Sequence, residues 1–112
     1  MVDKEIRAGF YVCASICGQD GIISETEERA LVQIFTATFG LNVSEVDQLF
    51  DDFFSSTNNF EEYLSHVVDI DLRLQIHKIA KISAASDDLE VRENIALKRA
   101  AIIWELGLCQ GQ

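Results

Sequence analysis

The sequence predicts an all-α protein, a compact bundle of about six helices that forms one domain over residues 1–112. Proline, which interrupts helices, is absent from the 112 residues. Apolar residues recur at spacings of three and four, which is the helical period, and no segment alternates between apolar and polar residues as a strand does. Hydrophobic residues make up 48% of the chain, which at this length is enough to bury a core and argues against disorder.

The first half of the chain divides into three predicted helices. The first apolar stripe contains Ile6, Phe10, Cys13 and Cys17. The second contains Ala30, Leu31, Ile34, Phe35 and Thr38, and it ends at Gly40, a favourable residue at a helix C-terminus. Ser44 is expected to cap a short third helix, whose stripe is Val46, Leu49, Phe50, Phe53 and Phe54.

In the second half of the chain, a polar loop is expected at residues 55–59, and the apolar pattern predicts three more helices after it. A short fourth helix carries Phe60, Tyr63, Leu64, Val67 and Val68. A longer fifth helix carries Leu72, Ile76, Ile79, Ala80 and Ser83. The sixth starts near Glu90, stops near Gly107, and carries Ala96, Ala100, Ile103 and Trp104.

These stripes also predict which side chains form the core. The expected buried residues are Ile34, Phe35, Leu49, Phe53, Leu64, Ile76, Ile79, Ile103 and Trp104. The aromatic-rich stretch of residues 50–60 is expected to pack into the core rather than to line a ligand site. Truncation of a buried aromatic costs about 3–5 kcal/mol, so Phe53→Ala is predicted to fall in that range.

The charge balance is strongly acidic and narrows the possible partners. Nineteen acidic residues face nine basic ones, for a net charge of -10. Such a surface repels phosphate backbones, so nucleic-acid binding is not expected, whereas cations and protein partners are. No apolar run of about 18 residues is present, and residues 1–5 do not resemble a signal peptide. We therefore expect a cytoplasmic protein with no membrane insertion; its oligomeric state is open.

The cysteines and histidines do not form a recognisable catalytic or zinc motif. Cys13 and Cys17 are one helical turn apart, a spacing that suits a disulfide poorly, and we expect small buried residues there. His66 and His77 lack the second Glu-x-x-His unit of ferritin-like metal sites and are expected on helix surfaces. No nucleotide-binding loop or nucleophile elbow occurs either, so we expect a protein that is not an enzyme.

The two ends of the chain share a pattern that predicts a divergent internal repeat of two helical hairpins. Each half leaves a helix rich in small residues, turns at an Asp-Gly or an Asp-Asp pair, and enters a second helix. An aliphatic residue precedes a glutamate by four in both halves: Ile23 with Glu27, and Leu89 with Glu93. Two such hairpins would pack together, because neither buries its apolar face alone. Packing with approximate twofold symmetry would bring the two acidic turns close together.

The acidic turns allow a structural and a functional interpretation. In the structural one, Ser24 and Glu27 form a capping box, and Asp87 or Asp88 caps the helix after the second turn. In the functional one, Asp20, Glu27, Asp87 and Glu93 converge to hold a divalent cation. The first turn matches only the second half of an EF-hand loop, so the acids of both turns would have to be pooled to reach a sufficient ligand count.

At these turns the chain resembles the TerB-like family, which includes the tellurite-resistance protein TerB and the N-terminal cytoplasmic part of DjlA-type co-chaperones. The family pattern is an Asp-Gly turn, a hydrophobic residue, a serine and then a glutamate, and it matches here at Asp20, Gly21, Ile23, Ser24 and Glu27. The second turn matches at Asp87, Leu89 and Glu93, but Asp88 replaces the usual glycine. The resemblance spans about residues 6–108. It implies an all-helical stress-response protein, with metal binding through these acids and no enzyme activity.

Two functional hypotheses follow. The first is an acidic module of tellurite resistance or stress response that binds a divalent metal, Ca²⁺ or Mg²⁺, through its acidic turns. The alternative is a non-catalytic helical scaffold that binds a partner protein without metal. Stabilisation by cations distinguishes the two.

Overall fold

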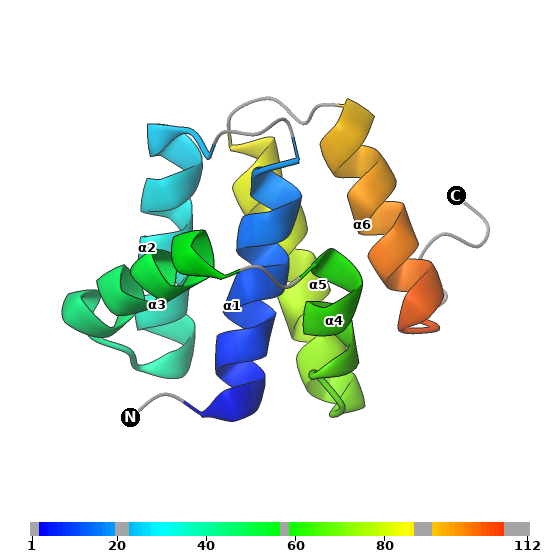
Figure 1. The fold of residues 1–112 in the computed structure, drawn as a ribbon, viewed down its shortest axis with the longest axis horizontal. Helices are drawn as coiled ribbons and strands as arrows, with labels where there is room; N and C mark the ends of the chain where they lie inside the picture. The colour runs from blue at the N-terminus through cyan, green and yellow to red at the C-terminus, as the bar shows by residue number, and fades with distance from the viewer. Residues whose placement is uncertain (1–2, 20–22, 57–58, 87–90, 107–112) are drawn as a thin grey trace.

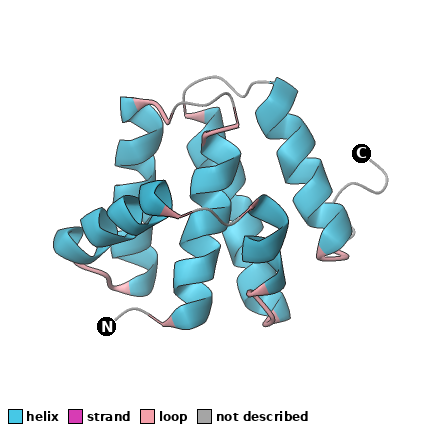
Figure 2. Cartoon of the chain, in the orientation of Figure 1, coloured by secondary structure: helices cyan, strands magenta, loops and turns pink. Residues whose placement is uncertain are grey.

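The computed structural model describes residues 3–19, 23–56, 59–86 and 91–106, and within them the chain forms six helices and no strand (Figures 1 and 2). The all-α prediction is therefore confirmed. In chain order, the helices are α1 (Lys4–Cys17), α2 (Glu25–Phe39), α3 (Val43–Ser55), α4 (Phe60–Ser65), α5 (Ile70–Ala85) and α6 (Val91–Ile103). The radius of gyration is 12.8 Å, the value expected of a folded domain of this length.

Side-chain caps explain where the helices begin. Helices α1 to α5 each start after an Asp, Asn or Ser whose side chain accepts a hydrogen bond from a backbone N–H of the first turn. The cap predicted at Ser44 is wrong, because the helix already begins at Val43 and its capping box is formed by Asn42, two residues earlier, with Glu45. Gly40 adopts a left-handed φ of 70° and ends α2 as predicted.

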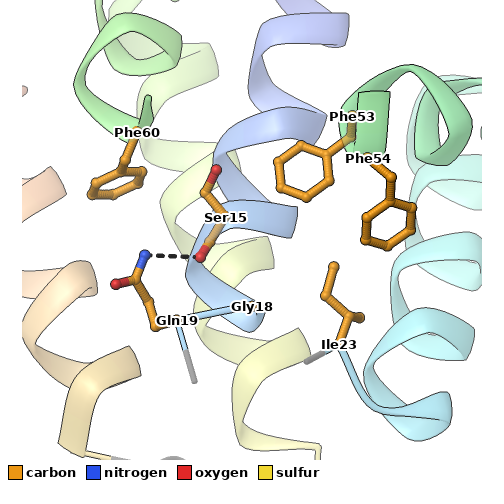
Figure 3. A pocket seen from close by; sticks show the side chains of 7 residues that line it. All are labelled: Ser15, Gly18, Gln19, Ile23, Phe53, Phe54 and Phe60. Carbon is orange, nitrogen blue, oxygen red and sulfur yellow. Dashed lines mark hydrogen bonds between the residues drawn. The ribbon is translucent and has the colours of Figure 1, made fainter. Parts of the chain in front are cut away.

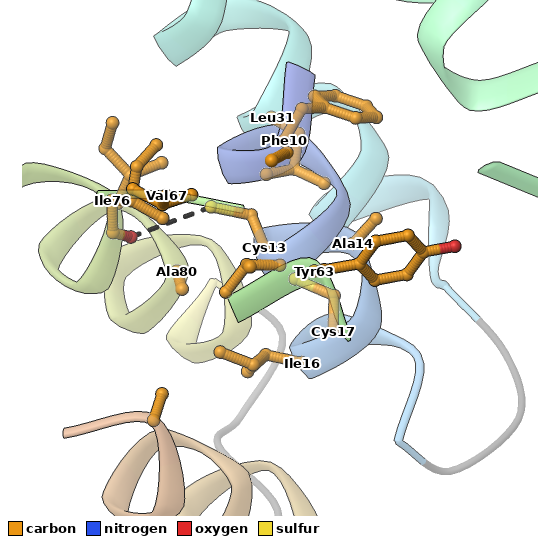
Figure 4. Packing of buried hydrophobic residues seen from close by; sticks show 14 of the residues in the cluster. Phe10, Cys13, Ala14, Ile16, Cys17, Leu31, Tyr63, Val67, Ile76 and Ala80 are labelled. Atoms are coloured by element: carbon orange, nitrogen blue, oxygen red, sulfur yellow. Dashed lines mark hydrogen bonds between the residues drawn. The ribbon is translucent and has the colours of Figure 1, made fainter. Parts of the chain in front are cut away.

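The centre of the bundle is the contact between α1 and α5, which lie side by side (Figure 1). Gly9 allows the close approach, because a Cβ built there would lie 2.5 Å from Cδ1 of Ile76. One turn further along α1, the Cys13 thiol donates a long hydrogen bond of 3.6 Å to the carbonyl of Ile76 (Figure 4). Helices α2 and α6 both contact this central pair. The arrangement is the one expected of two packed hairpins.

The core agrees with most of the sequence prediction and departs from it at three residues. Phe35, Leu49, Leu64, Ile76, Ile79 and Trp104 are buried. Ile34 and Phe53 are half-buried at the edge of the core. Ile103 is 42% exposed, so its predicted burial is wrong. The last turn of α6 buries Ala100, Ala101 and Trp104 instead, and an apolar stripe cannot show which of two apolar faces points inward.

Two long-range hydrogen bonds fasten the outer parts of the bundle. The indole Nε1 of Trp104 donates to the carbonyl of Leu64 at 2.8 Å and so ties the end of α6 to α4. The carboxylate of Glu5 accepts from the backbone N–H groups of Val68 and Asp69 at 2.7 and 2.9 Å, which ties α1 to the start of α5. Both contacts bridge segments far apart in sequence, so they fix how the second hairpin sits against the first.

Candidate functional site

The candidate site lies where α1 and α5 end and α2 and α6 begin, at the top of the view in Figure 1. Glu27 occupies the first turn of α2. Its backbone N–H donates to the hydroxyl of Ser24 at 3.1 Å, and its carboxylate Oε1 accepts from the backbone N–H of Ser24 at 3.0 Å. The predicted capping box is thus present, and it fixes the position of the Glu27 carboxyl.

The first turn of α6 supplies a second glutamate at the same place. Glu93 is 2% exposed and Glu27 is 3% exposed, so both carboxyl groups are buried. Their side chains are hydrogen-bonded to each other. The two helices that carry them are the second members of the two hairpins, so the predicted convergence of the acidic turns is seen at these two residues. The repeated spacing of an aliphatic residue four before a glutamate is the sequence signal that pairs them.

Burial and proximity shift the ionisation of this pair. Burial raises the pKa of Glu27 to about 7, well above its ordinary value of 4.5. The capping hydrogen bonds from Ser24 act in the opposite direction, whereas the hydrogen bond and the charge of Glu93 raise this pKa further. When two carboxyl groups are in contact, the state with one proton bound is more favourable than the state in which both groups carry a negative charge.

This shift predicts that stability falls as pH rises. Between pH 4.5 and about 7 the folded protein holds a proton at Glu27 that the unfolded chain has released, so the free energy of unfolding decreases with pH through that window. Urea denaturation in chelator, from pH 5 to pH 8, measures the slope. We expect Glu27→Gln to flatten the slope while preserving the capping box, which accepts glutamine.

The matched control for this titration is Glu28→Gln, which makes the same change at the next residue, on an exposed side chain. It should leave the slope of the wild-type protein intact. Equal slopes in the wild-type protein and in Glu27→Gln would show that Glu27 does not carry the pH dependence.

A buried thiol adjoins the carboxyl pair. The pKa of Cys17 is raised by burial and, beyond that, by the negative charges of Glu27 and Glu93. Burial likewise raises the pKa of Cys13, with a smaller effect from Cys17. Both cysteines are free and buried, as expected from the sequence. Because the thiolate is the nucleophile and the metal ligand, neither cysteine is suited to either role here.

The other predicted ligands, Asp20 and Asp87, lie outside the described residues. Within the described ranges, no group of three or more His, Cys, Asp and Glu side chains is arranged to hold a metal ion. Of the four predicted ligands, Glu27 and Glu93 lie within the described residues, and the structure brings these two together. The proposed caps Asp87 and Asp88 also fall outside the described part of the chain.

The histidines take no part in the carboxyl pair. His66 is exposed, as predicted. The prediction for His77 is wrong: it is 8% exposed, and its Nε2 lies 2.8 Å from the carbonyl of Leu97, where it links α5 to α6. The sequence pattern of α5 alone does not reveal that a hydrogen-bond acceptor on α6 allows His77 to be buried.

A cavity of about 320 Å³ lies beside the end of α1 (Figure 3). It is lined by Ser15, Gly18, Gln19, Ile23, Phe53, Phe54 and Phe60. The side-chain amide of Gln19 donates to the carbonyl of Ser15 at 2.9 Å, so its nitrogen is already engaged. The walls are mostly aromatic and aliphatic, and they include no ionisable side chain. This cavity offers apolar contact rather than acid–base or metal chemistry.

Fold and site together define an acidic helical bundle with a buried pair of carboxyl groups between two hairpins. A protein-family model described as tellurite resistance protein TerB matches residues 7–109. This match covers nearly the whole chain, so the chain belongs to the TerB family, and the resemblance seen in its acidic turns is confirmed. A search of curated proteins and a search of solved structures each found no match.

Proposed function

We propose that this chain is a stress-response module of the tellurite-resistance family that binds a divalent cation and has no catalytic activity of its own. The observation that carries the proposal is the hydrogen-bonded pair of buried carboxyl groups, Glu27 and Glu93. Burying two such groups side by side is unfavourable when both are charged. A bound cation would offset their repulsion, and it would do so at the end of the bundle where α2 and α6 begin.

The chemistry of the donors fits a hard cation. Glu27 and Glu93 offer carboxylate oxygens, and the capping hydrogen bond uses only part of the acceptor capacity of Glu27. Asp20 and Asp87 would supply further oxygens from the two turns. The neighbouring thiol of Cys17 is held protonated, which disfavours thiophilic ions. Oxygen ligands of this kind suit Ca²⁺ or Mg²⁺.

Two further features bear on where the protein acts. Among the described residues, no helix has the length and apolar character needed to cross a bilayer. The free thiols of Cys13 and Cys17 fit a reducing compartment, where disulfides are rare. We accordingly place its action in the cytoplasm.

The second candidate function is a scaffold that binds a partner protein without metal. The observation in its favour is the capping box, which already gives Glu27 a structural role. In that case Glu27 keeps its proton, and its hydrogen bond with Glu93 simply joins α2 to α6. The two functions differ in their response to cations, because a protonated pair gains nothing from a divalent ion.

Thermal melting at pH 7.5 tests the proposal, first in chelator and then with millimolar Ca²⁺, Mg²⁺, Mn²⁺ or Zn²⁺. A ligand at a hundredfold excess over its dissociation constant adds about 2.7 kcal/mol of stability. We expect Ca²⁺ or Mg²⁺ to raise Tm by roughly 10 °C or more, as that gain implies for a small domain. Glu93→Gln should abolish the rise, and in chelator it should melt above the wild-type protein, because it removes the repulsion within the pair.

The variants Asp20→Asn and Asp87→Asn test whether each turn contributes a ligand, and Glu28→Gln is the exposed control. If no ion changes Tm, cation binding is refuted and the scaffold function remains. An equal shift in the wild-type protein and in Glu93→Gln would place the bound cation elsewhere on the acidic surface. Loss of the effect in Asp20→Asn alone would mean that Asp88, standing in place of the usual glycine, has disabled the second turn.

A further inference from the structure

The outer face of α6 differs in character from the rest of this acidic protein. Its exposed aliphatic residues are Val91, Ile95, Ile102 and Ile103, and its exposed charged residues are Arg92, Lys98 and Arg99. The one acidic residue of the helix, Glu93, is buried. Helix α6 therefore presents a basic and apolar surface in a chain whose net charge is -10.

The spacing of these residues forms one continuous stripe. Val91, Ile95 and Ile102 follow one another at intervals of four and seven, so they lie on one side of the helix with Lys98 between them. Val91 is 75% exposed, Ile95 58% and Ile102 66%. Because α6 also buries Ala96, Leu97, Ala100 and Ala101, it is apolar on two opposite faces. Only one of these faces has a partner within the described chain.

Helix α3 carries a stripe of the opposite charge. Val43, Asp47, Asp51 and Phe54 recur at intervals of four, four and three, and all four are exposed. Val43 is 58% exposed and Phe54 63%. The helix contains four acidic residues and no basic one. Phe54 also lines the apolar cavity described above, which leaves room beside the stripe for an aliphatic side chain of another molecule.

Helices α3 and α6 lie at opposite ends of the long axis of the molecule, with α3 at the left and α6 at the right of Figure 1. They therefore cannot meet within one chain. Pairing α6 with α6, or α3 with α3, would oppose like charges, whereas pairing α3 of one copy with α6 of another opposes Asp47 and Asp51 to Lys98. Apolar residues flank the charges in both stripes.

From this complementarity we infer that the outer face of α6 binds the outer face of α3 of a second copy of this chain. The contact is head-to-tail, so a bound pair of copies leaves one α3 stripe and one α6 stripe free, and the association extends into chains or closes into a ring. Charge opposition sets which faces meet and in which order. The net charge of each copy opposes association at long range, and salt near 0.15 M screens that repulsion beyond about 8 Å. The association is therefore weak and concentration-dependent.

Sedimentation velocity on the full chain, from 10 µM to 1 mM in 0.15 M NaCl, tests the inference. The expected result is a weight-average mass that rises with concentration. Lys98→Glu puts a negative charge at the centre of the α6 stripe, and Asp47→Lys puts a positive charge in the α3 stripe, so each alone should associate at least about tenfold more weakly than the wild-type protein. Circular dichroism melts confirm that both variants are folded. Lys4→Glu makes the same charge reversal at an exposed residue outside both stripes and should associate like the wild-type protein.

The decisive step is to mix the two variants in equal amounts. The acidic α3 of Lys98→Glu then meets the basic α6 of Asp47→Lys, and the two reversed stripes complement each other, so the mixture should associate where neither variant does. The inference is overturned if the wild-type protein stays monomeric at 1 mM, or if the mixture stays monomeric. It is equally overturned if monomeric wild-type protein sediments with phosphatidylserine-containing vesicles and Lys98→Glu does not, because α6 then contacts an anionic lipid surface.

Discussion

Phe10→Ala should lower the free energy of unfolding by about 3–5 kcal/mol, the usual range for truncation of a buried aromatic side chain. Phe10 is fully buried on α1, and its ring packs edge-on against Phe35 and Phe50, with ring centroids 5.1 and 4.8 Å apart. It therefore joins α1 to both α2 and α3. Removing the ring leaves a cavity at that junction and also ends two favourable edge-to-face contacts.

Urea denaturation followed by circular dichroism measures this loss. The same truncation at Phe54 is the control, because Phe54 is 63% exposed although its ring stacks on Phe50. We expect Phe54→Ala to cost less than about 1 kcal/mol, as surface substitutions usually do. If Phe10→Ala cost no more than Phe54→Ala, the packing of α1 against α2 and α3 described above would be wrong.

Trp104→Ala should have an effect of similar size, about 3–5 kcal/mol, because it removes both a buried ring and a long-range hydrogen bond. Trp104 is 3% exposed, and its indole N–H donates to the carbonyl of Leu64 at 2.8 Å. Trp104→Phe separates the two contributions. It keeps most of the ring and removes only the hydrogen bond to the Leu64 carbonyl, which still accepts from the backbone N–H of Val67, so the expected cost is about 0.5–1.5 kcal/mol.

The neighbouring substitution Ile103→Ala controls for the position at the end of α6, because Ile103 is 42% exposed. The three variants are compared by urea denaturation with circular dichroism, since Trp104 is the single tryptophan of the chain and its fluorescence is lost on substitution. Costs of the same size for Trp104→Ala and Ile103→Ala would mean that Trp104 does not fasten α6 to α4.

The helical architecture follows from local features that a sequence displays directly. The period of the apolar residues located all six helices, and Gly40 and the Ser24–Glu27 box marked the end and the start of α2. The third helix shows the limit of such signals. Ser44 and Asn42 are both good caps, and the choice depends on Glu45, which completes a box with Asn42.

Features that depend on tertiary contacts were harder to predict. Ile103 satisfies the helical period of α6 but lies on its exposed side, because the alanines of that helix form the buried face. His77 was expected at the surface, yet the carbonyl of Leu97, twenty residues away in the chain, makes its burial possible. Neither partner can be recognised from a pattern within one helix.

The candidate site was predictable in part for the same reason. The repeat between the two hairpins predicted that the acidic turns would converge, and Glu27 and Glu93 do meet. The nearby thiol of Cys17 had no such signal, because its position depends on where α1 ends relative to the start of α2 and α6. A sequence repeat predicts that equivalent residues such as Glu27 and Glu93 approach each other. Contacts between helices that the repeat does not relate become visible only in the folded structure.

The most direct test of cation binding at the carboxyl pair is paramagnetic broadening by Mn²⁺ in amide NMR spectra of the isotope-labelled protein at pH 7.5. Bound Mn²⁺ broadens only signals from nearby residues, so it locates the site. The account predicts that substoichiometric Mn²⁺ removes the amide signals of Glu27 and Glu93 first, and that excess Mg²⁺ or Ca²⁺ restores them. The amide signals of Asp47 and Asp51 should persist, although α3 carries four acidic residues and no basic one. Broadening centred on α3, or spread evenly over the acidic surface, would contradict a cation site between the two hairpins.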